Sequence, residues 1–388
     1  MKRLFVQFKT AINIIILLMI DYVARKRKIA INKKELIIIR VDVIGDYVLF
    51  RNFLEDLRNS PKYQGYKITL LGDKSYRDLA EALDSVYVDK FIWLDKKKFI
   101  KNYRYRFTII RRLSRQGYEV LINPIYSREY LLSETLVKII PADDKIGCEG
   151  DQVNISLGNK AKADKNYTKL LANTKEVLFE FYRNREFFEQ LLEKSLTTKY
   201  FIHYDQRSLN LFHNQHKYAV LFLGASHPSR QWSPKHFAEV GQYLKKQFNY
   251  DIVICGSTLE IAQANSFKKH FMDDCIDLVG KTSLVELLTI LSTCQMLVTN
   301  ETSSAHLAVA LGNIPVFVIY NGRHFGRFVP YPKALTTHYY LIAHPFIIKH
   351  SEQYKIISNK RDYINTLDIN DIQPIEVIAK IAANYKIS

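Results

Sequence analysis

Short apolar runs alternate with stretches of helical periodicity along most of the chain. Four apolar runs in the first half predict buried strands, at 36–41, 66–72, 90–94 and 118–124. Between and after them, apolar residues recur at helical spacing and predict helices at 47–59, 75–83, 99–116 and 128–139. Strands that alternate with helices are typical of a parallel sheet covered by helices on both faces.

The same alternation restarts near Tyr218. Five further runs predict strands, at 218–224, 250–256, 275–280, 296–300 and 315–320. Helices are expected at 234–247, 258–270, 283–293 and 303–311. The chain is therefore predicted to be an α/β protein with two doubly wound, Rossmann-like domains facing a central cleft. Ligands of such sheets bind beyond the carboxyl ends of the strands.

A chain of 388 residues suits two domains better than one core. The pattern predicts an N-terminal amphipathic segment at 1–34, a first domain at 35–205 and a second domain at 206–368. A last helix, 369–388, is expected to cross back to the first domain.

The N-terminal segment contains an apolar stretch, Ala11 to Ile20, with basic residues on both sides. Ten residues are too few to span a bilayer, which takes about 20, and no signal-peptide cleavage pattern follows. A helix lying in the membrane interface, with its basic ends on anionic headgroups, fits this pattern. A helix packed on the protein's own core fits it equally well.

Charge adds information about partners. Lys and Arg number 56 against 39 acidic residues, a net charge of +17. Nucleic acid, an anionic membrane surface and an anionic substrate are the candidate partners, and a general bias toward Lys is a further explanation. Because the basic residues are dispersed and no nucleic-acid-binding motif is present, no nucleic acid is expected.

The four cysteines, Cys148, Cys255, Cys275 and Cys294, are scattered, and no C-x-x-C pair occurs. Neither a disulfide framework nor a zinc site has this spacing. We expect reduced thiols, a cytoplasmic protein and no metal or other cofactor.

The stretch LIIIRVDVIGDYVLF places Asp46 in the turn between a strand and a helix. Gly45 permits a tight turn or the close approach of another group. Asp46 is either the N-cap of the helix or a general base at the cleft. In the second half, the strand ending at Gly224 leads into a loop with Arg230, which is either a solvated loop residue or a phosphate clamp.

A third stretch, TNETSSAHLAVALG, joins the strand at 296–300 to a helix. A helix N-terminus surrounded by small hydroxyl residues offers free N–H groups and the positive end of a dipole, which together favour an anion. The alternative is a simple capped helix with Thr302 or Ser303 as N-cap. The loop after the next strand adds cations at the same edge, including Arg323.

These three stretches resemble the heptosyltransferase-like glycosyltransferases, family 9 of the inverting enzymes with the GT-B fold. The resemblance covers most of residues 35–335. It is carried by I-G-D-Y-V, by G-A-S-x4-R-x-W-S-P and, most specifically, by T-N-E-T-S-S-A-H-L-A-x-A-L-G and P-V-F-V-I-Y-N-G.

The resemblance implies a catalytic base, a donor site and an acceptor site. The base falls on Asp46, and Arg230 contacts the donor diphosphate. The donor site comprises Ser226, Arg230, Glu260, Glu301, Thr302, Ser303, Ser304, His306 and Arg323, and Glu260 would hold the donor ribose. The acceptor site is expected in the first domain, at Asn123, Arg104, Arg111 and Arg112.

Two residues depart from the family pattern. Glu301 stands where Asp is usual, and Ser303 stands where Gly is usual, so heptose is not assumed as the donor sugar. The basic run that contains Arg104, Arg111 and Arg112 is either a solvated helix face or a site for an anionic glycolipid or bilayer surface.

The resemblance implies an inverting, metal-independent transfer of heptose or another hexose-like sugar. The donor is a nucleotide-diphosphate sugar, and the acceptor is a lipopolysaccharide core or another lipid-linked saccharide. The enzyme would lie on the inner face of the cytoplasmic membrane. The alternatives are a nucleotide-sugar epimerase, a UDP-sugar-dependent enzyme of the same fold, a family member that binds without turnover, and a basic nucleic-acid-binding protein.

Overall fold

The computed structural model describes residues 2–25, 29–204, 217–312 and 314–386. The chain forms two compact units. Unit 1 comprises Met1–Val43, Phe53–Thr174 and Arg183–Thr198, and unit 2 comprises Ile44–Asn52, Lys175–Tyr182 and Lys199–Ser388. The chain therefore crosses between the units several times, rather than once near residue 205 as the sequence pattern predicted.

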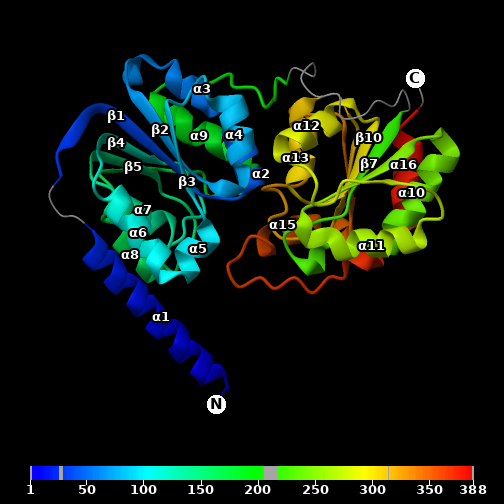
Figure 1. The fold of residues 1–388 in the computed structure, drawn as a ribbon, viewed down its shortest axis with the longest axis horizontal. Coiled ribbons are helices and arrows are strands. Elements are labelled where there is room, and N and C mark those ends of the chain that lie inside the picture. Colours follow the sequence, from blue (N-terminus) through cyan, green and yellow to red (C-terminus); the bar gives the residue numbers. More distant parts are fainter. Residues whose placement is uncertain (1, 26–28, 205–216, 313, 387–388) are drawn as a thin grey trace. The chain divides into compact units, whose positions relative to one another are not determined.

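Unit 1 is built on a six-stranded parallel sheet in the order β3-β2-β1-β4-β5-β6 (Figure 1). The strands are β1 (Ile31–Arg40), β2 (Lys67–Asp73), β3 (Lys90–Leu94), β4 (Gly117–Asn123), β5 (Ala142–Cys148) and β6 (Lys169–Leu171). Leu36 to Ile39 of β1 are fully buried. This apolar run therefore forms the centre of the sheet, as expected for a parallel strand covered on both faces.

Eight α-helices of the described chain belong mainly to unit 1. They are α1 (Lys2–Ala24), α3 (Phe53–Arg58), α4 (Arg77–Asp84), α5 (Lys96–Lys101), α6 (Tyr103–Leu113), α7 (Ser133–Ile139), α8 (Leu157–Asp164) and α9 (Glu180–Leu192). Short 3₁₀ turns lie at Pro61–Tyr63 and Lys74–Tyr76. The predicted helix at 99–116 is two helices, because Asn102 ends α5 and its side chain caps α6.

Unit 2 repeats the architecture with a parallel sheet in the order β12-β11-β10-β7-β8-β9. Its strands are β7 (Tyr218–Phe222), β8 (Asp251–Cys255), β9 (Ile276–Asp277), β10 (Met296–Asn300), β11 (Val316–Tyr320) and β12 (Tyr339–Ala343). Counted along each unit, both sheets have the strand order 3-2-1-4-5-6 of a doubly wound nucleotide-binding fold. The predicted α/β class with two Rossmann-like domains is confirmed.

The helices of unit 2 are α2 (Ile44–Phe50), α10 (Pro234–Phe248), α11 (Ile261–His270), α12 (Leu284–Thr293), α13 (Ser303–Leu311), α14 (Pro345–Lys349), α15 (Ser351–Ile357) and α16 (Pro374–Asn384). Short 3₁₀ turns lie at Pro228–Arg230, Thr258–Glu260 and Ile369–Asp371. The start of α10 follows the Ser-Pro signal in the sequence, with Ser233 at the N-cap position and Pro234 as the first helical residue.

The C-terminal helix differs from its prediction. It was expected to cross back to the first domain, but α16 packs on α10 and on the strands β11 and β12 of unit 2. Val377 and Ile381 are fully buried there, and the Trp232 Nε1–H donates to the Ile372 carbonyl oxygen at 2.8 Å. The apolar side of α16 is therefore used inside its own unit.

The N-terminal helix α1 packs on α6 in unit 1. Asp21 forms a buried ion pair with Arg106, with Oδ1–Nε and Oδ2–Nη2 distances of 2.6 and 2.7 Å. Within the described residues, no helix has both the length and the apolar character needed to cross a membrane.

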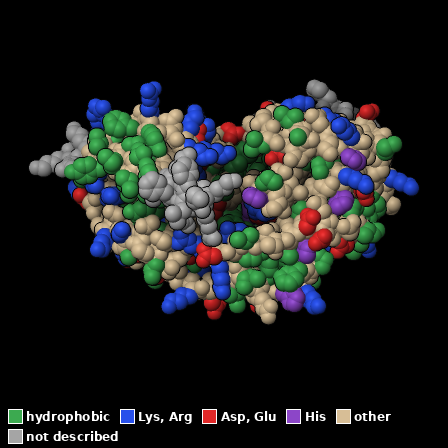
Figure 2. All heavy atoms as spheres, turned by 90° about the horizontal axis from the view of Figure 1, so that it is seen from below, with side chains coloured by type: hydrophobic (Ala, Val, Ile, Leu, Met, Phe, Trp, Pro, Cys, Tyr) green, Lys and Arg blue, Asp and Glu red, His purple; other side chains and the backbone are tan. Residues whose placement is uncertain are grey.

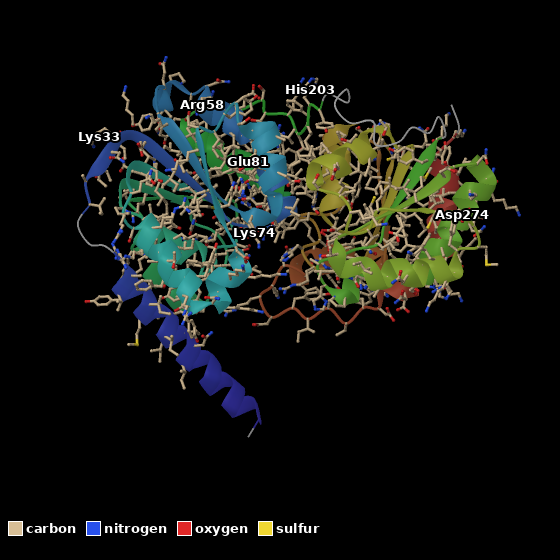
Figure 3. The ribbon with its side chains drawn as sticks, viewed as in Figure 1. Lys33, Arg58, Lys74, Glu81, His203 and Asp274 are labelled. Atoms are coloured by element: carbon tan, nitrogen blue, oxygen red, sulfur yellow. The ribbon has the colours of Figure 1, made fainter. Side chains whose placement is uncertain are left out.

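Several exposed charges of unit 1 form ion pairs, either between elements or within one helix. Lys33 contacts Asp143 at 2.8 Å, Lys74 contacts Asp95 at 2.7 Å and Arg77 contacts Glu81 at 3.0 Å. Figure 3 labels Lys33, Lys74 and Glu81. Exposed pairs of this kind contribute roughly 0–1 kcal/mol each. The fold is therefore determined mainly by the buried sheets and their helices.

Candidate active site

Two loops meet where the strand order of unit 2 reverses. Strands β7 and β10 are neighbours, but the chain leaves them toward opposite sides of the sheet. The loop after β7 covers residues 223–233, and the turn after β10 covers residues 301–302. Such a switch point, at the carboxyl ends of the strands, is where open α/β sheets bind ligands.

The side chain of Asn300, the last residue of β10, connects these two loops through hydrogen bonds. Its Nδ2 donates to the carbonyl oxygens of Leu223 at 2.9 Å and Gly224 at 3.2 Å. Its Oδ1 accepts from the backbone N–H of Trp232 at 3.0 Å. The side chain is fully buried, so Asn300 fixes the floor of the site without facing a ligand. Asn300 lies in the T-N-E-T-S-S motif, but no role was predicted for it.

Arg230 and Glu301 approach each other across the switch point. The Arg230 guanidinium forms an ion pair with the Glu301 carboxylate and donates to the Ser226 hydroxyl. Burial raises the pKa of Glu301, and the adjacent Arg230 opposes this shift. Arg230 remains partly exposed. The guanidinium is therefore held at the carboxyl end of the sheet, where it can also bind an anion.

Helix α13 begins beside this pair. Thr302 occupies the N-cap position with extended backbone, and its side chain makes no capping hydrogen bond to the described helix. Ser303 is the first helical residue, and the Ser304 hydroxyl is buried at 3.0 Å from the Thr299 hydroxyl. The first N–H groups of α13 therefore lack a side-chain cap, which leaves a donor edge for an anion.

Two neighbouring tyrosines hold His306, one turn further along α13. The Tyr200 hydroxyl donates to the His306 carbonyl oxygen at 2.7 Å and lies 3.1 Å from the Tyr331 hydroxyl. The His306 Nδ1 lies 2.5 Å from the Tyr331 hydroxyl. Burial lowers the pKa of His306 to about 4, so the ring is neutral at pH 7.

This arrangement assigns the tautomer of His306. The Tyr200 hydroxyl donates its proton to the His306 carbonyl oxygen, so it can only accept from the Tyr331 hydroxyl. The Tyr331 oxygen in turn accepts from the His306 Nδ1–H. The Nε2 atom is left as an acceptor. It points toward Gly45: an ideal Cβ at that glycine would lie 2.8 Å from the His306 Cδ2 and 3.3 Å from the Nε2.

Helix α2 carries Asp46 and packs on α13 within unit 2. The helix begins at Ile44, so Asp46 lies in its first turn rather than at the N-cap position. Gly45 is buried against His306, whereas Asp46 is partly exposed. The sequence pattern assigned Asp46 to the first domain. The structure places it on the unit that carries Arg230, Glu301 and α13.

We expect Gly45→Ala to reduce turnover, because a methyl group here would contact the His306 ring and displace α2. Overpacking of this kind costs roughly 1–3 kcal/mol. Gly158 is a matched control, since it is also the second residue of a helix and an ideal Cβ there has nothing within 4 Å. Gly158→Ala should stabilise the protein by up to about 1 kcal/mol. Chemical unfolding and steady-state kinetics of both variants measure the effect, and equal behaviour would contradict a close α2–α13 contact.

The family follows from a sequence comparison. The model of the family described as "Glycosyltransferase family 9 (heptosyltransferase)" matches residues 106–343, well over half of the chain. The chain belongs to glycosyltransferase family 9.

Two heptosyltransferases match shorter stretches of the sequence. The Lipooligosaccharide heptosyltransferase 2 of Haemophilus influenzae is 30% identical over 99 residues, which are 24% of this chain and 28% of that protein. The Lipopolysaccharide heptosyltransferase 2 of Escherichia coli is 28% identical over 97 residues, or 24% and 27% of the two chains. The chain thus matches less than a third of the length of these relatives.

Solved structures of the family share the whole fold. A family 9 glycosyl transferase from Veillonella parvula has a TM-score of 0.66 at 18% identity, and the alignment covers 93% of this chain and 98% of that one. The E. coli heptosyltransferase WaaC with ADP has a TM-score of 0.64 at 17% identity, with 90% and 100% coverage. This likeness confirms the predicted GT-B fold class.

Two donor residues predicted for this family 9 chain, Glu260 and Arg323, already have hydrogen-bond partners within unit 2. The Glu260 carboxylate accepts from the Ser257 N–H at 2.7 Å and the Ser257 hydroxyl at 2.6 Å, and it packs beside Gly224. Arg323 donates from Nη2 to the Lys360 carbonyl oxygen at 3.0 Å. Neighbouring His324 has positive φ, and burial together with Arg327 and Arg323 lowers its pKa to about 3.

The predicted acceptor residues of unit 1 separate into two groups. Asn123 is fully buried: its Nδ2 donates to the Tyr167 hydroxyl at 2.7 Å, and that hydroxyl donates to Glu134 at 2.8 Å. This network holds the end of β4 and leaves the amide no exposed surface. Arg104, Arg111 and Arg112 are exposed on α6. Only this exposed group is accessible to an acceptor or a lipid.

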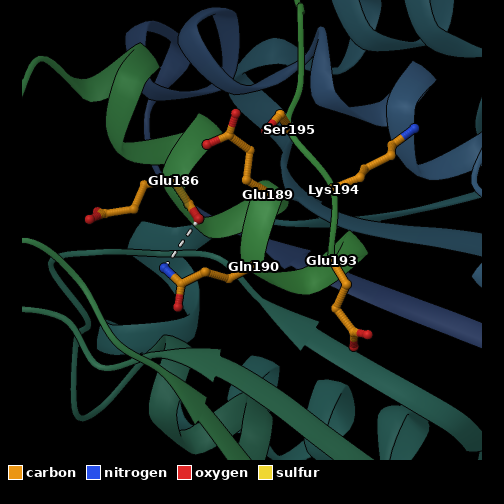
Figure 4. Close-up of a pocket in the computed structure, with 6 residues that line it drawn as sticks. All are labelled: Glu186, Glu189, Gln190, Glu193, Lys194 and Ser195. Atoms are coloured by element: carbon orange, nitrogen blue, oxygen red, sulfur yellow. Dashed lines mark hydrogen bonds between the residues drawn. The ribbon is translucent and has the colours of Figure 1, made fainter.

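A surface hollow at the end of α9 lies in unit 1, away from these groups. It is lined by Glu186, Glu189, Gln190, Glu193, Lys194 and Ser195 (Figure 4). Glu193 pairs with Lys62 at 2.7 Å, and the Gln190 Nε2 donates to the Glu186 carbonyl oxygen at 3.2 Å. Within the part of the chain that the structure describes, no group of three or more His, Cys, Asp or Glu side chains could hold a metal ion. We assign the hollow no role in the site.

Proposed function

We propose that this protein transfers a sugar from a nucleotide-diphosphate donor to a lipopolysaccharide-core or other lipid-linked saccharide. The observation that carries the proposal is the ion pair of Arg230 with Glu301, which directly precedes the uncapped N-terminus of α13, at the switch point of unit 2. A diphosphate needs fixed donors and positive charge, and this edge supplies both.

The donor diphosphate is placed against Arg230 and the first N–H groups of α13. The Ser226 and Thr302 hydroxyls lie in the same two loops and can donate to phosphate oxygens. Glu260, held by Ser257 beside Gly224, would accept from the ribose hydroxyls. The solved structure of WaaC contains ADP, which makes an ADP-sugar, with heptose or another hexose-like sugar, the first donor to test.

Asp46 is the proposed general base. The acceptor hydroxyl oxygen forms a bond to the anomeric carbon while the bond from that carbon to the diphosphate oxygen breaks. The hydroxyl proton passes to the Asp46 carboxylate, and the departing nucleoside diphosphate keeps the electron pair. Attack from the face opposite the leaving group inverts the anomeric centre. Arg230 and the α13 amides stabilise the charge that develops on the leaving oxygen.

His306 positions this base rather than taking the proton itself. It is buried and neutral, and Tyr331 fixes its ring against Gly45, the residue before Asp46. The step as written uses only side chains and backbone groups, so we propose a metal-independent transfer. We also propose that the protein works at the inner face of the cytoplasmic membrane, where a lipid-linked acceptor is found.

Thermal unfolding with ADP, GDP, UDP and CDP tests the donor class. Ligand at 100 times its Kd stabilises the native state by about 2.7 kcal/mol, and we expect ADP to raise the Tm most. The matching ADP-sugar and a lipid-linked saccharide should then give glycosylated product and free ADP. An epimerised sugar released without acceptor would contradict transfer, and nucleotide binding without any product would indicate a member of the family that binds only.

A further inference from the structure

Helix α1 turns two polar side chains toward the protein, next to buried apolar Leu17, and leaves large apolar side chains exposed on its outward side. Between residues 12 and 23, its two polar side chains are Asn13 and Asp21, and both face the protein. Asn13 Oδ1 accepts from the Tyr103 hydroxyl at 2.5 Å, and Asp21 pairs with buried Arg106. A solvated helix normally shows its polar residues to water and its apolar ones to the core.

The outward side of this helix is apolar. Its large exposed hydrophobic residues are Ile12, Ile15, Met19, Tyr22 and Val23, which we call the α1 face. Ile15 is 56% exposed, Met19 62% and Val23 72%. Figure 2 shows hydrophobic side chains gathered on the part of unit 1 where α1 lies. A contiguous apolar patch of this kind usually marks a docking surface.

The orientation of the α1 face is set by the ion pair beneath it. The Arg106 guanidinium contacts both Asp21 oxygens, the Leu131 carbonyl oxygen at 2.9 Å and the Thr135 hydroxyl at 3.1 Å. Ala24 joins the core of unit 1. The helix therefore cannot turn its apolar side inward without breaking a buried charge pair, which is a large penalty.

Basic side chains accompany the α1 face. Arg25 follows the helix and is exposed. The helix on which α1 packs, α6, exposes Arg104, Arg111 and Arg112, and Lys101 and Arg115 are exposed at its two ends. The described residues of these two helices thus present an apolar strip together with charge of one sign.

We propose that the α1 face and the exposed arginines of α6 bind the surface of an anionic bilayer, with α1 lying in the plane of the interface. A helix whose apolar side is buried at the headgroup boundary and whose flanks meet anionic lipid matches this pattern. A second copy of the chain is the weaker occupant, because a symmetric contact would bring the same arginines toward one another. The inference deepens the membrane contact proposed above by naming its surface.

Vesicle co-sedimentation of the full chain tests the proposal. Vesicles of phosphatidylcholine with added phosphatidylglycerol should bind the protein. Vesicles of pure phosphatidylcholine should bind it with an affinity at least about tenfold lower. The triple variant Ile15→Ser, Met19→Ser, Val23→Ser should lose at least about tenfold in binding to the anionic vesicles. The control variant Ile364→Ser, Ile375→Ser removes residues of unit 2 that are 79% and 68% exposed, and it should bind like the wild type.

A charge variant tests the arginines separately. Arg104→Glu, Arg111→Glu, Arg112→Glu should lose binding to the anionic vesicles, whereas Lys246→Glu, Lys269→Glu, which changes exposed lysines of unit 2, should keep most of it. Because the vesicles contain neither donor nor acceptor, the result does not depend on catalysis. The nucleotide-induced rise in Tm of the triple variant confirms that it is folded and that its donor site is intact.

Two outcomes would overturn the inference. Wild-type binding by the triple variant would show that the α1 face does not contact lipid. A concentration-dependent dimer that the triple variant loses, together with no vesicle binding by the wild type, would assign the face to a second copy of the chain. Failure of the sugar-transfer assay with normal vesicle binding would instead count against the proposed reaction alone.

Discussion

Asp46→Asn is expected to lower the rate of sugar transfer by about 10²–10⁴, the usual contribution of a general base. The substitution keeps the size of the side chain and removes its ability to take the acceptor proton. Donor affinity should stay close to that of the wild type, because the proposed diphosphate contacts come from Arg230 and α13. Single-turnover transfer and ADP-induced shifts in Tm separate the two effects.

Asp78→Asn is the control for the change in helix charge. Asp78 lies in the first turn of α4 in unit 1, as Asp46 lies in the first turn of α2. Both carboxylates interact favourably with a helix N-terminus, an effect of roughly 0.3–1 kcal/mol. Both variants should therefore lose a little stability, and only Asp46→Asn should lose activity. Near-normal transfer by Asp46→Asn would reduce Asp46 to a helix-stabilising residue.

Arg230→Ala should have the second largest effect, a fall in kcat/KM of about 10²–10³. The variant removes the charge proposed to meet the leaving diphosphate, and it leaves the half-buried Glu301 carboxylate without Arg230. We expect a weaker ADP-induced shift in Tm as well as slower transfer. Arg230→Lys should recover part of the ADP binding, because lysine restores the positive charge but not the planar, two-pronged hydrogen bonding of the guanidinium.

Arg77→Ala is the matched control for loss of an arginine–glutamate pair. Arg77 pairs with Glu81 on the exposed side of α4 at 3.0 Å, far along the chain from the donor loops. Its loss should change stability by less than about 1 kcal/mol and leave nucleotide binding unaffected. If Arg230→Ala keeps full ADP binding, Arg230 is a structural partner of Glu301 and not a diphosphate ligand.

Most of the sheet could be predicted from the sequence because its strands are fully buried. The run at 36–41 and the run at 296–300 are continuous and apolar, and both became central strands. Three strands were not predicted: β5 and β6 lack a continuous apolar run, whereas β12 has one but is only partly buried. β5 begins with Ala142-Asp143-Asp144-Lys145, of which Asp143 and Asp144 are exposed, and β6 has only three residues. Near the sheet edges, burial is partial and the apolar pattern weakens.

The residues that position the site through buried hydrogen bonds were less predictable than the residues proposed to contact the ligand. Arg230 and the 301–306 segment stood out through motif spacing. Asn300, Tyr200 and Tyr331 did not, because their roles come from contacts between segments up to 131 residues apart in the chain. Asn123 shows the converse: it ends a strand as a ligand residue would, but Tyr167 encloses it.

The two departures from the family pattern have a local explanation. Ser303 is the first residue of α13 and is not among the described residues with positive φ, so this position does not require glycine. Glu301 extends far enough to pair with Arg230. The structure therefore accommodates both residues beside Arg230 and the start of α13, where we propose that the sugar donor binds.

The division of the chain at Ile44 has a consequence for how a catalytic cycle could run. Because α2 packs on α13, the proposed proton acceptor and the proposed leaving-group contacts belong to the same unit. An acceptor bound to unit 1, as predicted, would then supply only the nucleophile. Hydrolysis of an unused donor would then be governed by water access to unit 2 alone, and could be measured in the absence of any acceptor.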